Sequence, residues 1–430
     1  MIRGRRAAVP VIAAAAAVSL AGFLYIFGYR DQYYALLKAW GAPPFRFPFL
    51  DMHGVDAAIE CHRLGFDVFV ENPCDVFRRV HPYSPVWLWL SVIPITTGWD
   101  NALGLACDLL FLVALAFLPP GRGRWQIAVM TAAAVSSVVM FALERANADV
   151  IMFVFAVLAA RLTLGRAPSR TLGYGVALLS GFLKFYPIVL LVLAIRERLG
   201  RFVVIGLIAT GTIVLWFVLD SHEIMQAMAN IPTTLYFDEF TFGARDLPFG
   251  LAQTLRWSRP AAIGLMVALL AGTAGVAVGL AKLDDTAARL RHLTEAEATF
   301  LLMGSVLTIG CFVVAQNVLY RSIYFLFVLP GLTALVRAEG RRWLDLVCFV
   351  TIGAIIVLMW NDTVRTLIDG VLGWFDVTAR PGDIAHFYIW LVREIMWWGV
   401  VMVLAALMMR LIWSARATRD AVAVLSATIA

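Results

Sequence analysis

Apolar stretches long enough to cross a membrane alternate with short polar segments along almost the entire chain. A helix needs about 20 mainly apolar residues to cross a bilayer core. The predicted crossings are Val9–Tyr29, Asn101–Leu118, Gln126–Leu143, Val150–Leu164, Phe202–Leu219, Ala261–Leu280, Thr299–Val314, Ser322–Leu335, Trp343–Trp360 and Phe387–Ile412. With two half-length helices, Leu172–Leu183 and Ile188–Ile195, the pattern predicts an all-α polytopic protein with about twelve membrane segments.

Composition agrees with a membrane protein. The chain is 61% hydrophobic, whereas only about half of the residues in a soluble domain are apolar. Its net charge of +6 is no sign of nucleic-acid binding, because most arginines lie in short loops, where they set orientation. Arg3, Arg5 and Arg6 precede a first helix without a convincing cleavage site. We therefore expect a single integral domain over residues 1–430, in a bacterial inner membrane, with both termini cytoplasmic.

A lone lysine, Lys184, interrupts the apolar stretch Thr171–Ile195. Its ammonium is costly there unless it faces protein, water or an anion, and the nearby Pro187 breaks a helix. Arginine clusters flank the stretch at both ends, so a single crossing would put one cluster outside. The positive-inside rule favours two half-length helices that turn at Lys184-Phe-Tyr-Pro187 near the outer face. A tilted single helix with a snorkelling lysine is the alternative.

The first outer loop, residues 30–84, is unusually long, and loops of such length are often functional. The segment Pro85–Thr97 follows it. This segment is apolar and rich in tryptophan but too short to span, so we interpret residues 85–97 as an interfacial helix.

Unusual polar residues gather at the outer ends of the predicted helices. They are Asp51, His53 and Asp56; Glu144, Arg145, Asn147 and Asp149; Lys184 and Tyr186; Arg245 and Asp246; and Gln316, Asn317, Tyr320 and Arg321. A carboxylate there can take a proton from a hydroxyl nucleophile, and lysine or arginine can hold a phosphate as its charge develops. An outward-facing site for an anionic lipid donor accounts for this mixture of charges.

Each group also has a structural interpretation. Glu144, Arg145 and Asp149 fit a helix-end network of ion pairs and caps. Arg245-Asp246 and Arg321 fit interfacial anchors. Asp108, within a predicted crossing, fits a buried hydrogen-bonded acid.

The outer loop also holds two cysteines and two histidines. Because Cys61 and Cys74 share an oxidising compartment, we expect a disulfide between them, with two free thiols as the alternative. His53 and His62 lie near acids, but no tight ligand spacing indicates a metal site. A divalent cation is thus an unsupported alternative, and we expect no required cofactor.

Several short motifs together resemble a known family. They are Phe49-Leu-Asp51, Asn72-Pro73 with His81-Pro-Tyr-Ser-Pro85 before the tryptophan-rich segment, Glu144-Arg-Ala-Asn-Ala-Asp149 and Leu183-Lys-Phe-Tyr-Pro187. The pattern resembles the GT-C integral membrane glycosyltransferases, particularly glycosyltransferase family 87, which contains polyprenol-phosphate-mannose-dependent mannosyltransferases. It covers most of the chain in topology, and its motifs are short.

The resemblance implies an inverting transfer from a polyprenyl-phosphate sugar donor to a lipid or glycan acceptor at the outer face. It also implies that the acid in the first outer loop, Asp51, is the base and that Lys184 faces the donor phosphate. The family often has an aromatic pair after this acid, whereas His53-Gly-Val-Asp56 follows here. The choice between Asp51 and Asp56 therefore stays open.

We expect a membrane hexosyltransferase with a periplasmic active site and a mannose-like sugar. Asp51 or Asp56 is catalytic. Lys184, Arg145 and Arg321 hold the donor phosphate. The residues expected to contact substrate are His53, Glu144, Asn147, Asp149, Tyr186, Arg245, Asn317 and Tyr320. The rival is a transporter or flippase of a lipid-linked sugar, since broken helices and charges within the membrane also mark transporters. One-sided polar residues and a long first loop favour the enzyme.

Overall fold

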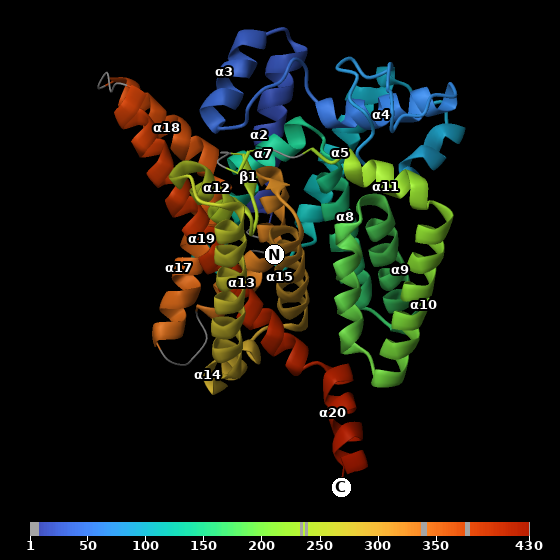
Figure 1. Cartoon of the computed structure of the whole chain (residues 1–430), viewed down its shortest axis with the longest axis vertical. Helices are drawn as coiled ribbons and strands as arrows, with labels where there is room; N and C mark the ends of the chain where they lie inside the picture. Colours follow the sequence, from blue (N-terminus) through green and yellow to red (C-terminus); the bar gives the residue numbers. More distant parts are fainter. Residues whose placement is uncertain (1–7, 233–234, 237–239, 337–341, 375–378, 430) are drawn as a thin grey trace. The chain divides into compact units, whose positions relative to one another are not determined.

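The computed structural model describes residues 8–232, 235–236, 240–336, 342–374 and 379–429. Within these ranges the protein is all-α apart from one short antiparallel ribbon (Figure 1). The ribbon pairs β1 (Thr241–Phe242) with β2 (Asn317–Val318). It joins the segment before α12 to the segment after α15.

The helices have the following bounds. The α-helices are α2 (Val9–Ile26), α3 (Arg30–Trp40), α4 (Leu50–Arg63), α5 (Asp100–Ala116), α6 (Arg124–Ala134), α7 (Ser137–Glu144), α8 (Ala148–Thr163), α9 (Ala167–Lys184), α10 (Leu199–Leu219), α11 (Ser221–Ala229), α12 (Asp246–Leu255), α13 (Arg259–Lys282), α14 (Asp284–Leu290), α15 (Glu295–Val314), α16 (Phe325–Leu335), α17 (Arg342–Met359), α18 (Asn361–Trp374), α19 (Ala379–Trp413) and α20 (Arg416–Ile429). The 3-10 helices are η1 (Pro85–Val92), η2 (Thr97–Trp99), η3 (Tyr186–Arg196) and η4 (Leu319–Tyr324).

Six helices in the described residues are long and apolar enough to cross a membrane. They are Val9–Ile26, Thr97–Ala116, Leu199–Leu219, Arg259–Lys282, Glu295–Val314 and Ile384–Trp413. The count rises to eight if each of two bent pairs, α6 with α7 and α17 with α18, is one span. Only 6% of the apolar window of α10 is buried inside the protein, as expected for a helix that faces lipid. The chain is therefore a multi-pass membrane protein, and the total of twelve segments stays an expectation.

Contacts along the chain define two compact units. Unit 1 consists of Met1–Pro44, Leu115–Ala142 and Thr234–Leu411. Its core lies where α16 packs against α15, α6 and α17. Stacked aromatic rings, with Phe242 at 4.1 Å and Phe325 at 5.1 Å from Trp397, extend that core to β1.

Unit 2 consists of Phe45–Ala114, Leu143–Thr233 and Ile412–Ala430. Here α8 packs along α9, and α9 packs along η3, while α4 lies against η1 and η2. The candidate residues Asp51, His53 and Asp56, the whole 144–149 segment and the Lys184 segment belong to this unit.

The chain reverses direction at Lys184, as the arginine pattern predicts. Helix α9 ends at Lys184, Phe185 has a φ of 59°, and η3 begins at Tyr186. The two arms lie close together: a Cβ on Gly181 would be 2.6 Å from Ile188 Cδ1. At the far end, the side chain of Arg170 donates to Glu197 Oε1 at 2.6 Å. Both arginine clusters therefore lie at the same end of one hairpin, and a single straight helix is excluded.

The segment after the first loop differs from the expected helix over residues 85–97. It forms a 3-10 helix that ends at Val92. The helix ends there because Ile93, which precedes Pro94, is extended. The indole of Trp87 in η1 donates to the carbonyl of Leu183 at 2.9 Å. That bond satisfies one of the last carbonyls of α9, so η1 supports the break at Lys184.

This hairpin makes a testable prediction about topology. Cysteines introduced as Arg166→Cys and Arg198→Cys should react with a membrane-impermeant maleimide from the same side, because the hairpin brings both exposed positions to one end. Labelling in intact cells and in inverted vesicles measures this. Reaction of the two positions from opposite sides would contradict the hairpin.

Candidate active site

The start of α4 is docked onto the turn that follows α7. The backbone N–H groups of Phe49 and Asp51 donate to the carbonyls of Glu144 and Arg145, at 2.6 and 3.1 Å. The first N–H groups of a helix lack partners within the helix, and this turn supplies them. Two motifs almost a hundred residues apart in sequence thereby meet, and Asp51 comes to face Arg145.

Asp51 accepts hydrogen bonds from three side-chain nitrogen atoms. The guanidinium of Arg145 binds it through two nitrogens, with Nε 2.8 Å from Oδ2. Asn147 Nδ2 donates to the same Oδ2 at 2.5 Å. Arg79 approaches Oδ1 at 3.8 Å, and the ring of Phe45 lies 4.2 Å from the guanidinium carbon of Arg145. A two-point arginine–carboxylate pair is among the stronger polar contacts in proteins.

A second ion pair continues from the first through Asn147. Lys184 Nζ lies 2.8 Å from Asp149 Oδ2 and donates to Asn147 Oδ1 at 3.2 Å. The hydroxyl of Tyr186 donates to the other oxygen of Asp149. The ring of Tyr83 faces the ammonium, with its centroid 5.2 Å from Nζ. Asn147 also caps α8 by accepting the Asp149 N–H at 2.8 Å, so one amide joins both pairs.

We call these six residues the paired network: Asp51, Arg145, Asn147, Asp149, Lys184 and Tyr186. The side chain of Lys184 is 5% exposed and that of Asp149 is fully buried. The two acids and two cations balance, as burial requires. Removal of one member of a buried pair typically costs about 3–5 kcal/mol, because the other charge is left without its partner.

Three residues with positive φ flank the paired network. They are Phe49 at 62°, Ala146 at 43° and Phe185 at 59°. Non-glycine residues seldom adopt this region, and it costs of order 1–3 kcal/mol each. Ala146 and Phe185 each lie between two network residues, and Phe49 lies two residues before Asp51. The backbone is thus strained where the polar groups meet, as is frequent at functional sites.

A separate buried group surrounds Asp56. His53 Nδ1 lies 2.7 Å from Asp100 Oδ2, and His53 Nε2 accepts the Val76 N–H at 3.2 Å. That acceptance leaves the ring proton on Nδ1, donated to Asp100. Burial, followed by the charge of Asp100 and a hydrogen bond with it, raises the pKa of Asp56 to about 8. His53 therefore orients Asp100, and Asp56 is a largely neutral acid near pH 7.

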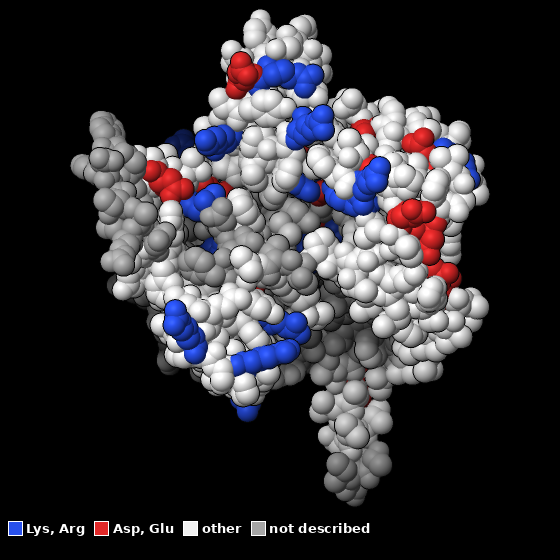
Figure 2. All heavy atoms as spheres, turned by 45° about the horizontal axis from the view of Figure 1, so that its top comes forward, with Lys and Arg blue, Asp and Glu red and all other residues white. Residues whose placement is uncertain are grey.

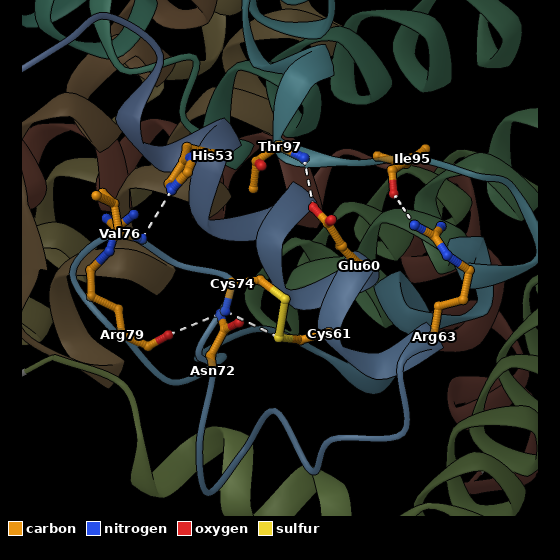
Figure 3. The surroundings of a disulfide bond; sticks show 10 residues. All are labelled: His53, Glu60, Cys61, Arg63, Asn72, Cys74, Val76, Arg79, Ile95 and Thr97. Carbon is orange, nitrogen blue, oxygen red and sulfur yellow. Dashed lines mark hydrogen bonds between the residues drawn. A yellow bond between two sulfur atoms is a disulfide. The ribbon is translucent and has the colours of Figure 1, made fainter.

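The disulfide Cys61–Cys74 joins α4 to the following loop, with the two Cα atoms 5.8 Å apart (Figure 3). On the other side of α4, Glu60 accepts the Thr97 N–H at 2.9 Å, and Arg63 donates to the Ile95 carbonyl at 2.8 Å. Figure 2 shows the face of the molecule that is turned forward in that view, where acidic and basic residues lie among residues of other types. His81 lies near the end of this loop. Burial lowers the pKa of His81 to about 4, so its ring is neutral near pH 7.

Four expected site residues belong to unit 1. Asn317 donates to the Cys311 and Ala315 carbonyls, at 2.5 and 2.7 Å, and accepts from Arg321. The ring of Tyr320 packs against Phe141 with centroids 5.7 Å apart. Arg245 is exposed and precedes α12. Asn317 and Arg321 thus form a local polar contact of their own.

Sequence reasoning missed several residues around the first loop. Asp75 is 1% exposed and binds Arg79 through Oδ2 at 2.7 Å, while Arg79 also donates to the Leu50 carbonyl at 2.9 Å. The spacing of four between Asp75 and Arg79 is the signal that could have found them. Asp100 gave no such signal, because its partners lie far away in sequence.

Comparison with family models, with curated proteins and with solved structures finds no match for this chain. Among the described residues, no group of three or more histidine, cysteine or acidic side chains is arranged to hold a metal ion.

The raised pKa of Asp56 predicts a pH effect on stability. The folded state favours the neutral acid, so this group's contribution to stability is lost as pH rises from its ordinary pKa of 3.8 to about 8. Asp56→Asn should therefore gain melting temperature relative to wild type as pH rises across that range. Thermal unfolding in detergent measures it, with exposed Glu71→Gln as control. Parallel curves for wild type and Asp56→Asn would contradict the assignment.

Proposed function

We propose that this protein is a membrane glycosyltransferase that moves a sugar from a polyprenyl-phosphate donor to a lipid or glycan acceptor. A GT-C-like arrangement in a bacterial inner membrane, with cytoplasmic termini and a periplasmic site, belongs to the same proposal. The paired network is the observation that supports this proposal. A membrane chain that gathers two buried acids, a buried lysine and a partly buried arginine beside a helix break has the groups that this reaction needs.

Each charged member of the network has a role in the transfer. The acceptor oxygen attacks the anomeric carbon from the face opposite the phosphate, and the bond from that carbon to the phosphate oxygen breaks. The bonding electrons leave with the polyprenyl phosphate, whose added charge Lys184 and Arg145 stabilise. The acceptor's proton passes to Asp51. The donor is already activated, so the step needs no nucleotide.

The same contacts define what donor binding has to change. Arg145 and Asn147 donate three hydrogen bonds to the Asp51 carboxylate, so most of its roughly four accepting positions are already taken in the resting protein. A donor phosphate competes with Asp51 for Arg145 and with Asp149 for Lys184. Binding of the donor would thus release the base at the moment when it is needed.

The geometry favours Asp51 over Asp56 as the base. A general base must be ionised at the working pH. Burial and the charge of Asp100 raise the pKa of Asp56 to about 8, so Asp56 is largely neutral near pH 7. Asp51 also contacts the cations that would hold the phosphate, and Asp56 belongs to the His53–Asp100 group.

The base assignment predicts a loss of turnover. Asp51→Asn keeps the shape of the side chain and removes its basicity, so transfer should fall about a hundred- to ten-thousand-fold. The assay uses purified protein, a panel of polyprenyl-phosphate sugars and membrane lipid extracts, and Glu71→Gln is the matched control in the same loop. Collapse in Asp56→Asn with near-normal turnover in Asp51→Asn would move the base to Asp56.

If wild-type protein carries the donor across reconstituted vesicles without breaking it, the transporter alternative replaces the enzyme. That outcome requires intact donor for every sugar in the panel, together with movement of the lipid between leaflets.

The phosphate role predicts a loss of affinity. Lys184→Met should weaken binding of polyprenyl phosphate, because the charge-assisted contact is lost. Lys184→Arg, which keeps the charge, should retain part of it. Titration with polyprenyl phosphate in detergent measures the Kd, and exposed Lys282→Met is the control. Unchanged affinity in folded Lys184→Met would return Lys184 to a structural ion pair.

A further inference from the structure

Unit 1 contains a second buried group of charges that the transfer reaction does not use. Asp246 begins α12, and Arg393 and Glu394 lie within α19. All three side chains are buried, with Asp246 and Glu394 at 0% exposure and Arg393 at 2%. Adjacent charges inside a helix long and apolar enough to span a membrane are expensive, and such residues mark functional sites by default.

The two helices approach closely at this point. A Cβ on Gly250, one turn after Asp246, would lie 2.4 Å from Trp390 Cζ2, one turn before Glu394. The charges of Glu394 and Arg393 act directly on Asp246. Gln316, just before β2, donates to Asp246 Oδ1 at 3.0 Å and to Thr241 Oγ1 in β1 at 3.4 Å. The group therefore links α12, α19 and the ribbon.

The hydrogen bonds in this group are incomplete. Arg393 binds Glu394 through Oε1 alone, with Nε at 3.0 Å and Nη2 at 2.7 Å. Among the described residues, Asp246 Oδ2 and Glu394 Oε2 are buried and accept no hydrogen bond. A buried carboxylate oxygen without a donor is costly. A proton on one acid would turn one such oxygen into a donor.

Charge balance points the same way. Among the described residues, two carboxylates and one guanidinium meet in this buried group and leave one negative charge, and two nearby carboxylates do not readily both ionise. A metal cation would be repelled by Arg393, whereas a single proton neutralises the group without added bulk. We propose that Asp246 and Glu394 form a proton-binding site that holds one exchangeable proton between α12 and α19.

The titration of Asp246 supports this site. Burial, followed by the charge of Glu394, raises its pKa to about 8, against the opposing effects of Arg393, Gln316 and Thr241. The protonated form favours the packed arrangement, so the contribution of Asp246 to stability is lost as pH rises through about 8. Release of the proton would weaken the packing of α12 and of the ribbon against α19. The site acts independently of the proposed transfer.

Infrared spectroscopy tests the site without any activity assay. A pH titration of purified protein should show a carbonyl band of a buried carboxylic acid that disappears near pH 8. The Asp246 part of this band is the difference between wild type and Asp246→Asn, which removes the contribution common to Asp56. The amide oxygen that this substitution introduces can still accept the bond from Gln316, so we expect the variant to fold. Asp284→Asn, at an exposed acid, should match wild type.

A second variant tests whether the proton is shared. In Glu394→Gln, the charge that raises the pKa of Asp246 is removed and the opposing charge of Arg393 stays, so Asp246 should be ionised and the band absent at pH 7. A band that persists there would show that burial alone protonates Asp246 and would overturn the shared site. Identical spectra for wild type and Asp246→Asn would also overturn it.

Chemical modification is an independent test. Dicyclohexylcarbodiimide should modify Asp246 or Glu394 below pH 8, and mass spectrometry locates the modified residue. If neither acid reacts below pH 8, the proton-binding site is contradicted.

Discussion

The buried pair between Lys184 and Asp149 is the interaction on which the arrangement of unit 2 depends. An ammonium 5% exposed and a carboxylate fully buried, 2.8 Å apart, have to be held together, because neither charge is tolerated alone in an apolar interior. The pair fixes the end of α9 against the start of α8. Asn147, which caps α8, then connects this pair to Asp51 and Arg145, and so to α4. The helix break, the cap and the docking of the first loop are consequences of one requirement for charge pairing.

The fold was predictable from the sequence where the physical signal is local. The reversal at Lys184 follows from a proline, a charge and two arginine clusters, all within a short stretch. The disulfide between Cys61 and Cys74 follows from the oxidising compartment that the two outer-loop cysteines share. The choice of partners was not predictable, because Asp51 and Arg145, like His53 and Asp100, are brought together by tertiary packing. The 3-10 form of η1 and the division into two units likewise depend on contacts between distant segments.

The paired network and the Asp246 group compensate their buried charges in different ways. In the paired network each acid has its own cation, and both side-chain polar atoms of Asn147 have partners, so an incoming phosphate has to exchange with an existing carboxylate. In the Asp246 group the cation is shared by two acids, and a proton supplies the missing charge. The first arrangement suits the binding of an anion, and the second suits the binding of a proton. Adjacent Arg393 and Glu394 within an apolar span were the sequence signal for the second group.

The central claim is that Lys184 is held for an anionic ligand and that Asp149 occupies its place in the resting protein. The affinity of Asp149→Asn for polyprenyl phosphate, measured by titration in detergent, tests this claim most directly. If the carboxylate competes with the phosphate for the ammonium, its neutral replacement should bind polyprenyl phosphate more tightly than wild type does. If Lys184 and Asp149 form only a structural pair, the folded variant will bind no better than wild type and will show only a loss of stability, which would contradict the account.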